Sequence, residues 1–584
     1  MKFPSRIALM YKQDGKYVNI TYQQLSDYVD AVAFNLKKLG INRGDSVGIY
    51  SYNRPEWVMV DLAVLKLGAV VVPIYHVMTP FYIKYMINDA KIKLLFVENA
   101  ALYQKLESIQ SEVPILKNVA LFDPSGMNNN KTYLKFDDIK KVPDTTLQTS
   151  GFTSQVLADD IATIVYTSGT TGEPKGVVLT HYNIVSNALA GIERFSVNEN
   201  DVMLSYLPLS HMFERTGGYY VMMFSGGAIG YAENFSTIVL DIGEVQPTIL
   251  VALPRVLEKA YETAVQKVAS GPWIQRKLVT SAIKNLNRYY NLNYKKKPIP
   301  RILKIKCNIY DKLVASKFRK IAGGRLRVMV SGGAPLNKQI AKIYHILGLN
   351  ICEGYGLTET APVISSTFID DNRLGTVGKP FPDVQIKIGD NQEILVKGPN
   401  LMLGYHNKPD ETRKAIDQGG WFHTGDQGKL DKDGNLIITG RIKELIVTSY
   451  GKNIPPIPIE EKICRCGYIE QVMLYGDKKN FIVALVVPNK KLIEYYARSN
   501  KISCENYTEL CASNDIKTFL TNEIENATTD LAPYEKIKAF TIIPEGFNID
   551  NGMLTPTLKL RRNKVLEKYK PLIEAMYTKT GPEK

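Results

Sequence analysis

The most informative stretch of the sequence is Tyr166-Thr-Ser-Gly-Thr-Thr-Gly-Glu-Pro-Lys-Gly176, which directly follows the apolar run Ile161-Ala-Thr-Ile-Val165. The run predicts a buried strand, and a helical pattern begins near His181, so the stretch is a loop between a strand and a helix. Its glycines let a ligand approach the backbone, and its amide groups are typical of an anion-binding nest. Ser168, Thr170 and Thr171 add hydroxyl donors, and Lys175 adds a compact positive charge. The stretch therefore predicts a phosphate-binding loop, of a type other than G-x-x-x-x-G-K-[ST].

Strand and helix patterns alternate around this loop. Short β-branched runs at Ser46–Tyr50, Gly68–Ile74 and Lys93–Val97 predict strands, and Pro55–Leu67 predicts a helix. Such alternation is typical of parallel sheets with helices on their faces. We therefore expect an α/β fold.

The chain of 584 residues is too long for one small core, and its pattern changes twice. Long helical patterns with few strand signals fill residues 255–320, which we interpret as a helical insertion. After Gly440 a compact α+β pattern begins and continues to the end. We expect a large N-terminal domain of layered sheets and helices at 1–440 and a small mobile C-terminal domain at 441–584.

The positive charge is concentrated in one segment. The net charge is +15, and residues 264–330 hold seventeen Lys or Arg and one acid, Asp311. Seventeen minus one gives +16, so the rest of the chain sums to about −1. Such a field attracts an anionic membrane surface or the phosphates of a cofactor, unless it is only a solvated face. No recognition motif accompanies it, so we expect no nucleic-acid partner.

The composition also bears on location. No signal-peptide core follows the N-terminus, and the longest weakly polar stretch, residues 217–232, is shorter than the ~20 residues of a spanning helix. The six cysteines lack C-x-x-C spacing, which indicates reduced thiols. We expect a cytoplasmic protein, and the sequence leaves open its peripheral attachment to the inner face of a membrane through residues 264–330. The sequence leaves monomer and homodimer equally open.

Further motifs accompany the loop. They are Ser331-Gly-Gly-Ala-Pro-Leu336, Glu353-Gly-Tyr-Gly-Leu-Thr-Glu-Thr360, Trp421-Phe-His-Thr-Gly-Asp426, Gly440-Arg-Ile-Lys-Glu444 and Leu554-Thr-Pro-Thr-Leu-Lys-Leu-Arg-Arg562. Together with the loop they resemble the adenylate-forming superfamily, which includes acyl-CoA synthetases, aryl-CoA ligases, luciferases and peptide-synthetase adenylation domains. The resemblance extends from about Ile20–Leu25 to Thr555–Lys559, nearly the whole chain.

The resemblance implies a site for ATP with Mg²⁺. The phosphate-binding residues are then Thr167, Ser168, Gly169, Thr170, Thr171, Gly172 and Lys175. The adenine pocket is formed by Gly332, Gly333, Ala334, Tyr355 and Gly356. A tyrosine at this place can stack on a purine ring.

Four more residues complete the implied nucleotide site. Thr358 hydrogen-bonds a phosphate, and Glu359 is a hard oxygen ligand suited to Mg²⁺. Asp426 binds the ribose hydroxyls, and Arg441 is a second sugar contact.

Two lysines carry the implied mechanism. Lys443 occupies the family's hinge position, and Lys559 is the lysine that enters the cleft for adenylation. Several relatives carry another lysine shortly after the hinge for thioester formation, whereas here none follows before Lys452. The residues of the thioester step therefore stay open.

The acid is expected to be a long-chain fatty acid and the acceptor coenzyme A. Leu207–Arg215, Pro254–Lys259 and Tyr310–Val314 resemble long-chain acyl-CoA synthetases, and His211 falls at the family's gate beside the acyl pocket. We thus expect ATP-dependent formation of acyl-AMP and then acyl-CoA. The alternatives are a fatty acyl-AMP ligase that loads a carrier protein, an aryl or sterol acid ligase, and a non-catalytic, nucleotide-binding membrane protein. Chain-length preference and pathway are not predicted.

Overall fold

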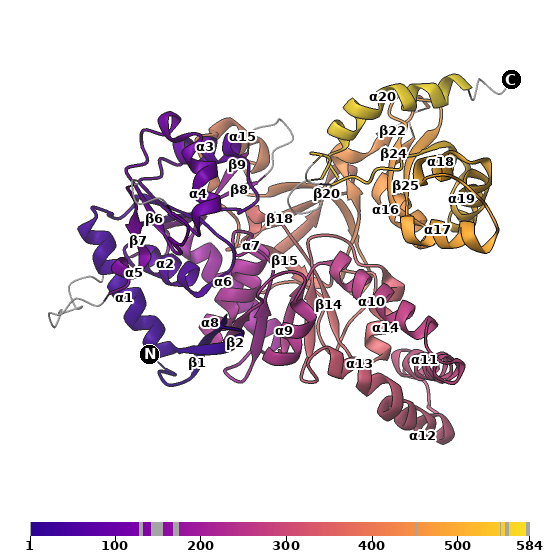
Figure 1. Ribbon diagram of the computed structural model, residues 1–584, viewed down its shortest axis with the longest axis horizontal. Coiled ribbons are helices and arrows are strands. Elements are labelled where there is room, and N and C mark those ends of the chain that lie inside the picture. Colours follow the sequence, from indigo (N-terminus) through magenta and orange to yellow (C-terminus); the bar gives the residue numbers. More distant parts are fainter. Residues whose placement is uncertain are drawn as a thin grey trace. The chain divides into compact units, whose positions relative to one another are not determined.

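A computed structural model of the chain (Figure 1) describes residues 2–127, 132–141, 156–167, 174–450, 452–548, 551–554 and 560–579, without the side chains of Lys443, Asn453 and Lys579. The chain divides into two units. Unit 1 comprises Met1–Lys387, Leu395–Thr424 and Leu430–Ile437, and unit 2 comprises Ile388–Ile394, Gly425–Lys429 and Ile438–Lys584. The expected domain limits, 1–440 and 441–584, remain a prediction.

One sheet of unit 1 carries the glycine-rich loop. Its eight strands are ordered β19-β9-β8-β4-β3-β5-β6-β7. Their bounds are β3 Ser46–Tyr50, β4 Val70–Ile74, β5 Leu94–Val97, β6 Asn118–Leu121, β7 Leu134–Lys135, β8 Ile161–Thr167, β9 Lys175–Thr180 and β19 Gly404–Tyr405. The strands from β8 through β4 and β3 to β7 pair in parallel, whereas β8 and β9 are antiparallel. The four strand runs expected in this region, and the α/β class that they predict, are confirmed.

Helices of this region follow the predicted pattern. Helix α1 is Tyr22–Lys38, α2 is Pro55–Lys66, α3 is Pro80–Asp89, α4 is Ala100–Glu107 and α6 is His181–Phe195. Helix α6 starts at His181 because Thr180 caps it: the Thr180 hydroxyl accepts from the Asn183 amide, and the Asn183 side chain accepts from the Thr180 amide.

The second sheet of unit 1 has nine strands, ordered β16-β15-β14-β13-β12-β10-β11-β1-β2. Their bounds are β1 Ile7–Gln13, β2 Lys16–Thr21, β10 Val202–Ser205, β11 Ala228–Tyr231, β12 Ile249–Ala252, β13 Val328–Ser331, β14 Ile351–Gly356, β15 Val363–Ser366 and β16 Lys379–Pro380. Strands β10 to β14 pair in parallel, and Ser331 at the end of β13 lies opposite Glu353 on β14. The motifs that follow these two strands therefore begin at one edge of the sheet.

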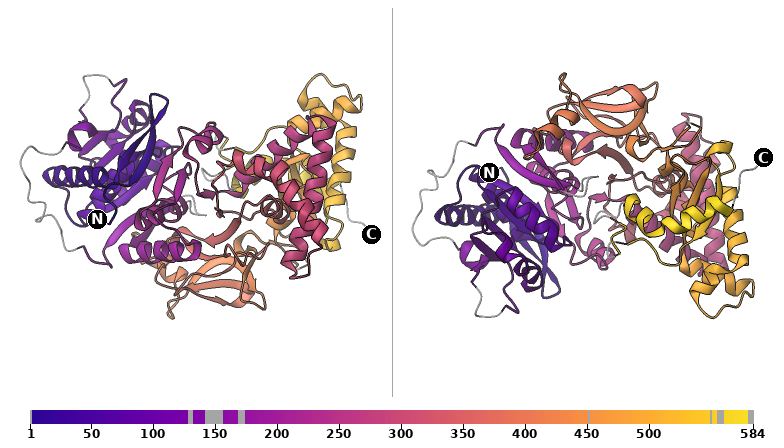
Figure 2. Two further views of the ribbon diagram at one scale, coloured as in Figure 1. Left: turned by 90° about the horizontal axis from the view of Figure 1, so that it is seen from below. Right: turned by 90° about the horizontal axis from the view of Figure 1, so that it is seen from above.

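Helices make up most of residues 254–321 of unit 1. Helix α10 is Pro254–Ala269, α11 is Trp273–Tyr294, α12 is Arg301–Tyr310 and α13 is Ser316–Ile321, with a π-helical turn at Asp311–Ala315. Figure 2 shows these helices gathered together, and α11 and α12 pack against each other. Their shared core includes Leu286, Leu303 and Cys307. Within the described residues no helix is both long and apolar enough to cross a membrane.

Unit 2 is built on the three-stranded sheet β24-β25-β26. Its elements are α16 Pro456–Cys464, β24 Ile469–Tyr475, β25 Ile482–Pro488, α17 Lys490–Ser499, α18 Tyr507–Ala512, α19 Asn514–Ala527, β26 Ile537–Ile542 and α20 Arg562–Lys579. All seven residues of β25 are buried, because its alternate side chains enter two cores. Ile482 packs with residues of α16, α17 and α19, and Val483 packs with residues of α20.

Candidate active site

The two ends of the phosphate loop lie side by side. Strand β8 ends at Thr167 and β9 begins at Lys175, and these two residues are paired across the hairpin. The Thr167 hydroxyl donates to the Lys175 carbonyl oxygen at 3.4 Å. A Cβ on Gly176 would lie 2.8 Å from the Ile164 side chain, so the hairpin requires glycine there. Five predicted phosphate-binding residues lie outside the described residues, namely Ser168, Gly169, Thr170, Thr171 and Gly172.

A chain of contacts joins Lys175 to Glu359. The Lys175 ammonium group forms an ion pair with Glu411 at 2.6 Å and lies 4.9 Å from the centre of the Tyr405 ring. The Tyr405 hydroxyl donates to the Glu359 carboxylate at 2.9 Å. Tyr405 reaches this position because β19 pairs with β9, opposite Val177. The structure thus gathers a predicted phosphate ligand and the predicted magnesium ligand around one tyrosine.

The protonation of this cluster follows from its contacts. Hydrogen bonds from Lys175 and Lys414 lower the pKa of Glu411 to about 2, so this exposed carboxylate is charged at neutral pH. Burial, and then the charge of Glu359, raise the pKa of Tyr405, so its hydroxyl stays a donor.

The donor chemistry of the cluster suits Mg²⁺. In the described parts of the chain no group of three or more His, Cys, Asp or Glu side chains could hold a metal ion by itself. Mg²⁺ needs no such group when substrate phosphates supply the other ligands. A single carboxylate, Glu359, beside the lysine of the phosphate loop fits this mode of binding.

The predicted adenine segment begins where β13 ends. A Cβ on Gly332 would lie 3.0 Å from the Phe213 ring, and Gly333 has φ +81°, which favours glycine. Gly333 and Ala334 are exposed, so this turn is accessible to a ligand.

Strand β14 places the next motif beside this turn. Tyr355 is half-buried and pairs with Ser365 on β15. A Cβ on Gly356 would lie 1.9 Å from the Pro362 carbonyl oxygen, so only glycine fits. Thr358 opens the 3₁₀ turn Thr358–Thr360, which also contains the magnesium candidate.

Glu353, at the start of the same motif, is buried. Burial raises the pKa of its carboxyl group to about 7, and the nearby backbone amides of Gly375 and Leu336 oppose this rise. Leu336 ends the predicted adenine segment. Glu353 therefore lies near both that segment and the loop at Gly375.

The predicted gate, His211, caps a short helical turn. The His211 Nδ1 atom accepts from the Phe213 amide at 3.2 Å. The Phe213 ring in turn lies against Gly332. This segment is thus close to the adenine turn, and the role of His211 as a gate remains a prediction.

A buried ion pair follows directly in the chain. The Arg215 guanidinium contacts the Asp61 carboxylate, and both side chains are fully buried. Arg215 also donates to the Thr163 hydroxyl at 2.8 Å, and Tyr219 and Tyr220 donate to Asp61 at 3.0 and 2.8 Å. Burial opposes the charge of Arg215, but Asp61 outweighs it and raises the pKa. This network anchors β8 four residues before the phosphate loop begins.

Glu214, which precedes Arg215 in the chain, is also buried, and no ion pair with its carboxyl group is found among the described residues. The Ser205 hydroxyl donates to its carboxyl group. Burial raises the pKa of Glu214 to about 8.

In unit 2 the two predicted sugar-binding residues are already together. Asp426 lies on strand β20, Phe422–Leu430, and Arg441 ends strand β21, Leu436–Arg441. The Arg441 Nε atom is 2.8 Å from the Asp426 carboxylate, which is buried. The pair holds the carboxylate in a fixed orientation.

Comparison with known proteins agrees with these motifs. The family model of AMP-binding enzymes matches residues 1–406, and that of the AMP-binding enzyme C-terminal domain matches residues 443–581. The chain belongs to the AMP-binding enzyme family. The superfamily predicted from its motifs is therefore confirmed.

Relatives of this AMP-binding enzyme match over nearly its whole length. It is 33% identical to long-chain-fatty-acid–CoA ligase FadD15 of Mycobacterium bovis, covering 97% of this chain and 93% of the relative. It is 31% identical to long-chain-fatty-acid–CoA ligase 1 of Homo sapiens, covering 97% and 83%. The crystal structure of ATP-bound MatB from Rhodopseudomonas palustris aligns with a TM-score of 0.72 at 22% identity, covering 98% and 97%.

The predicted hinge of this AMP-binding enzyme lies in a 3₁₀ turn, Ile442–Glu444, which contains Lys443. Lys559 lies outside the described residues. Leu554 and Leu560, which precede and follow the undescribed residues 555–559, form a β-bridge. Arg562, at the start of α20, contacts Glu460 at 2.8 Å and Glu444 at 3.8 Å. Contacts within unit 2 thus link the base of the lysine segment to the hinge turn.

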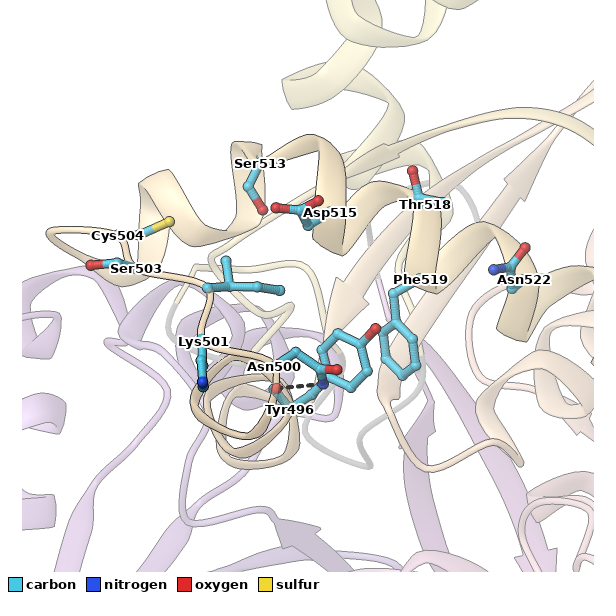
Figure 3. Close-up of a pocket in the computed structure, with 11 residues that line it drawn as sticks. Tyr496, Asn500, Lys501, Ser503, Cys504, Ser513, Asp515, Thr518, Phe519 and Asn522 are labelled. Atoms are coloured by element: carbon cyan, nitrogen blue, oxygen red, sulfur yellow. Dashed lines mark hydrogen bonds between the residues drawn. The ribbon is translucent and has the colours of Figure 1, made fainter.

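A cavity of about 580 Å³ lies elsewhere in unit 2, between α17 and α19 (Figure 3). Tyr496 and Phe519 stack along its wall with ring centres 3.7 Å apart, and the Asn500 side chain donates to the Tyr496 carbonyl oxygen at 2.9 Å. None of the site residues predicted from the sequence lines this cavity.

Sequence reasoning missed several residues of the site. Tyr405, Glu411 and Glu353 have no predicted role, because their contacts come from distant segments of the chain. The sequence could have indicated Asp61 and Arg215, because each is a charged residue in an apolar stretch. A charged side chain that is buried needs a partner of opposite charge.

Proposed function

We propose that this protein activates a long-chain fatty acid with ATP, forming acyl-AMP and pyrophosphate, and then transfers the acyl group to coenzyme A, releasing AMP. The observation that carries the proposal is the match, along 97% of the chain, to relatives named long-chain-fatty-acid–CoA ligases. The cluster of Lys175, Tyr405 and Glu359 supports it, because it offers cationic and metal-binding groups together.

In the first half-reaction the fatty acid carboxylate attacks the α-phosphate of ATP, and pyrophosphate leaves. Such chemistry depends mainly on positioning and charge neutralisation. Thr167 to Lys175 would hold the departing phosphates, with Thr358 as a further donor. Mg²⁺ held by Glu359 would neutralise phosphate charge.

The nucleoside would be held by residues of both predicted domains. The adenine would lie against the turn at Gly332, Gly333 and Ala334, with Tyr355 and Gly356 beside it. Asp426 would accept hydrogen bonds from the ribose hydroxyls, with Arg441 as its partner.

Lys559 would supply positive charge between the carboxylate and the α-phosphate. Rotation of the domain 441–584 about Lys443 would then remove Lys559 and open a path for the coenzyme A thiol. The thiolate attacks the acyl carbonyl and AMP leaves. The mixed anhydride must be shielded from water, so closure of the domains around it is expected.

Pyrophosphate release with ATP and acids of graded chain length tests the proposal. Lys559→Ala should lose most of the adenylation rate but still form thioester from pre-formed acyl-AMP. Lys564→Ala is the matched control. Lys564 is an exposed lysine of α20 that forms an ion pair with Glu567 at 2.8 Å. Equal pyrophosphate release by wild type and Lys559→Ala would remove Lys559 from its role.

Parallel assays with coenzyme A and with an acyl carrier protein identify the acceptor. Thioester formed only on the carrier would replace the proposed second step. Activity with aromatic or sterol acids alone would replace the proposed substrate.

We also propose a cytoplasmic location with peripheral attachment to an anionic membrane surface through residues 264–330. The charge of +16 in this segment supports it.

A further inference from the structure

Helix α12 exposes a line of large apolar side chains to solvent. Ile302, Ile305 and Ile309 are 71%, 61% and 50% exposed, and Leu313 continues the line into the π-helical turn. Their spacing of three and four residues places them on one face of the helix. The helix is meanwhile held to unit 1 by other residues, such as Leu303 and Cys307, which are buried. The exposed isoleucines are therefore not needed for the packing of α12.

Basic side chains flank this apolar line. At 100° per residue, Arg301 and Lys306 lie about 70° to either side of its centre. Both are exposed, as is Lys312 in the following turn. The one acid of residues 264–330, Asp311, is neutralised by Arg319, which contacts both of its carboxylate oxygens at 2.8 Å. An apolar line between two basic edges is typical of a helix that lies in a membrane interface.

We propose that α12 inserts into the surface of an anionic phospholipid membrane. Ile302, Ile305 and Ile309 would enter the boundary between headgroups and acyl chains, and Arg301 and Lys306 would contact lipid phosphates. The inference deepens the peripheral attachment proposed above and is independent of the chemistry of the active site: it names the element and adds apolar insertion to charge attraction.

Charge decides between a membrane and a second copy of the chain. Two copies meeting through α12 would bring segments of charge +16 together, which is repulsive. An anionic bilayer supplies both the opposite charge and an apolar layer beneath it.

Vesicle flotation of the full chain tests the proposal. The vesicles contain phosphatidylcholine alone, or equal parts of phosphatidylcholine and phosphatidylglycerol. Wild type should float with the anionic vesicles, and high salt should weaken but not abolish this binding. The triple variant Ile302→Ser, Ile305→Ser, Ile309→Ser should lose at least about tenfold in affinity, because each buried CH₂ group contributes to partitioning.

A matched control comes from helix α9, Ile238–Val245, outside the basic segment. Val239 and Leu240 are 64% and 66% exposed, so Val239→Ser, Leu240→Ser also removes exposed apolar surface from a helix. This variant should bind vesicles like wild type. Ile305→Trp should show blue-shifted emission that brominated lipids quench, and Val239→Trp should show neither.

Three results would overturn the inference. The first is triple-variant binding equal to that of wild type. The second is complete release of wild type by high salt, which would leave charge alone. The third is self-association that the triple variant loses while its vesicle binding is unchanged, which would assign the face to a second copy. Pyrophosphate release with a short, water-soluble acid is measured in parallel, so loss of the proposed ligase activity is seen separately from loss of flotation.

Discussion

Replacing Asp61 with Asn should destabilise unit 1 by about 3–5 kcal/mol. Asn preserves the volume of the side chain but removes the charge that faces Arg215. The guanidinium would then stay fully buried with only the Thr163 hydroxyl, at 2.8 Å, and aromatic rings around it. Tyr219 and Tyr220 both donate to the Oδ2 atom of Asp61, whereas Arg215 contacts Oδ1, and the single amide oxygen of Asn cannot serve both sides.

The expected destabilisation by Asp61→Asn comes from the unpaired, buried charge of Arg215 and not from the net stability of the ion pair. A buried ion pair contributes little net stability relative to apolar residues of the same shape, whereas removing one partner leaves an uncompensated charge. The double variant Asp61→Asn, Arg215→Met should therefore be at least about 2 kcal/mol more stable than the sum of the single variants predicts. The strongly exposed pair of Arg413 and Asp410 provides the control. Asp410→Asn should change stability by less than about 1 kcal/mol.

Urea unfolding at neutral pH measures these differences. Trp57 reports on the network directly, because its ring lies 5.3 Å from the Arg215 guanidinium. A midpoint for Asp61→Asn that corresponds to a loss below about 1 kcal/mol, or equal losses for the buried and the exposed pair, would refute the reasoning.

Three shorter predictions concern the site and its surroundings. Gly356→Ala should lower pyrophosphate release at least about tenfold, because its Cβ would lie 1.9 Å from the Pro362 carbonyl oxygen; wild-type rates would contradict this. Tyr405→Phe should raise the Mg²⁺ concentration for half-maximal pyrophosphate release about tenfold, because Glu359 loses the donor that orients it; an unchanged Mg²⁺ dependence would count against a metal at Glu359. Glu214 has an ordinary pKa of 4.5 that burial raises to about 8, so the folded protein holds the proton more tightly and stability falls as pH rises through this range. Glu214→Gln should therefore lose less stability than wild type between about pH 5 and about pH 8, as measured by urea unfolding, and parallel curves would exclude this group.

The elements around the phosphate loop were predictable because their signals are local. The apolar run that begins at Ile161 favours a strand through its own residues. Thr180 and Asn183 cap the next helix through contacts between residues only three apart in the chain. The glycine-rich stretch between them has few residues that favour regular structure. Local chemistry is thus enough to place the strand before the loop and the helix after it. The antiparallel strand β9, Lys175–Thr180, which lies between the loop and the helix, was not predicted.

The partners of the site residues were not predictable for the opposite reason. Lys175 and Glu411 are 236 residues apart in the chain, and they meet because β19 adds to β9 and carries α15, Pro409–Ala415, with it. No sequence pattern predicts a two-residue strand such as β19. The sequence likewise gives no role to Tyr405, because its contacts with Lys175 and Glu359 depend on the order of the strands in the sheet.

The two ion pairs near the phosphate loop have opposite properties, and the difference is one of solvent. Asp61 and Arg215 are buried on all sides, so neither can change partner without the cost of a bare charge in the interior. Glu411 is 36% exposed, and water can solvate its carboxylate when Lys175 leaves it, so this pair contributes little stability. Under the proposed function, nucleotide phosphates would compete with Glu411 for Lys175 at low cost, while strand β8 would keep its place. A loop that must bind and release phosphate needs this combination: an exchangeable cation at its end and a fixed charge network under its strand.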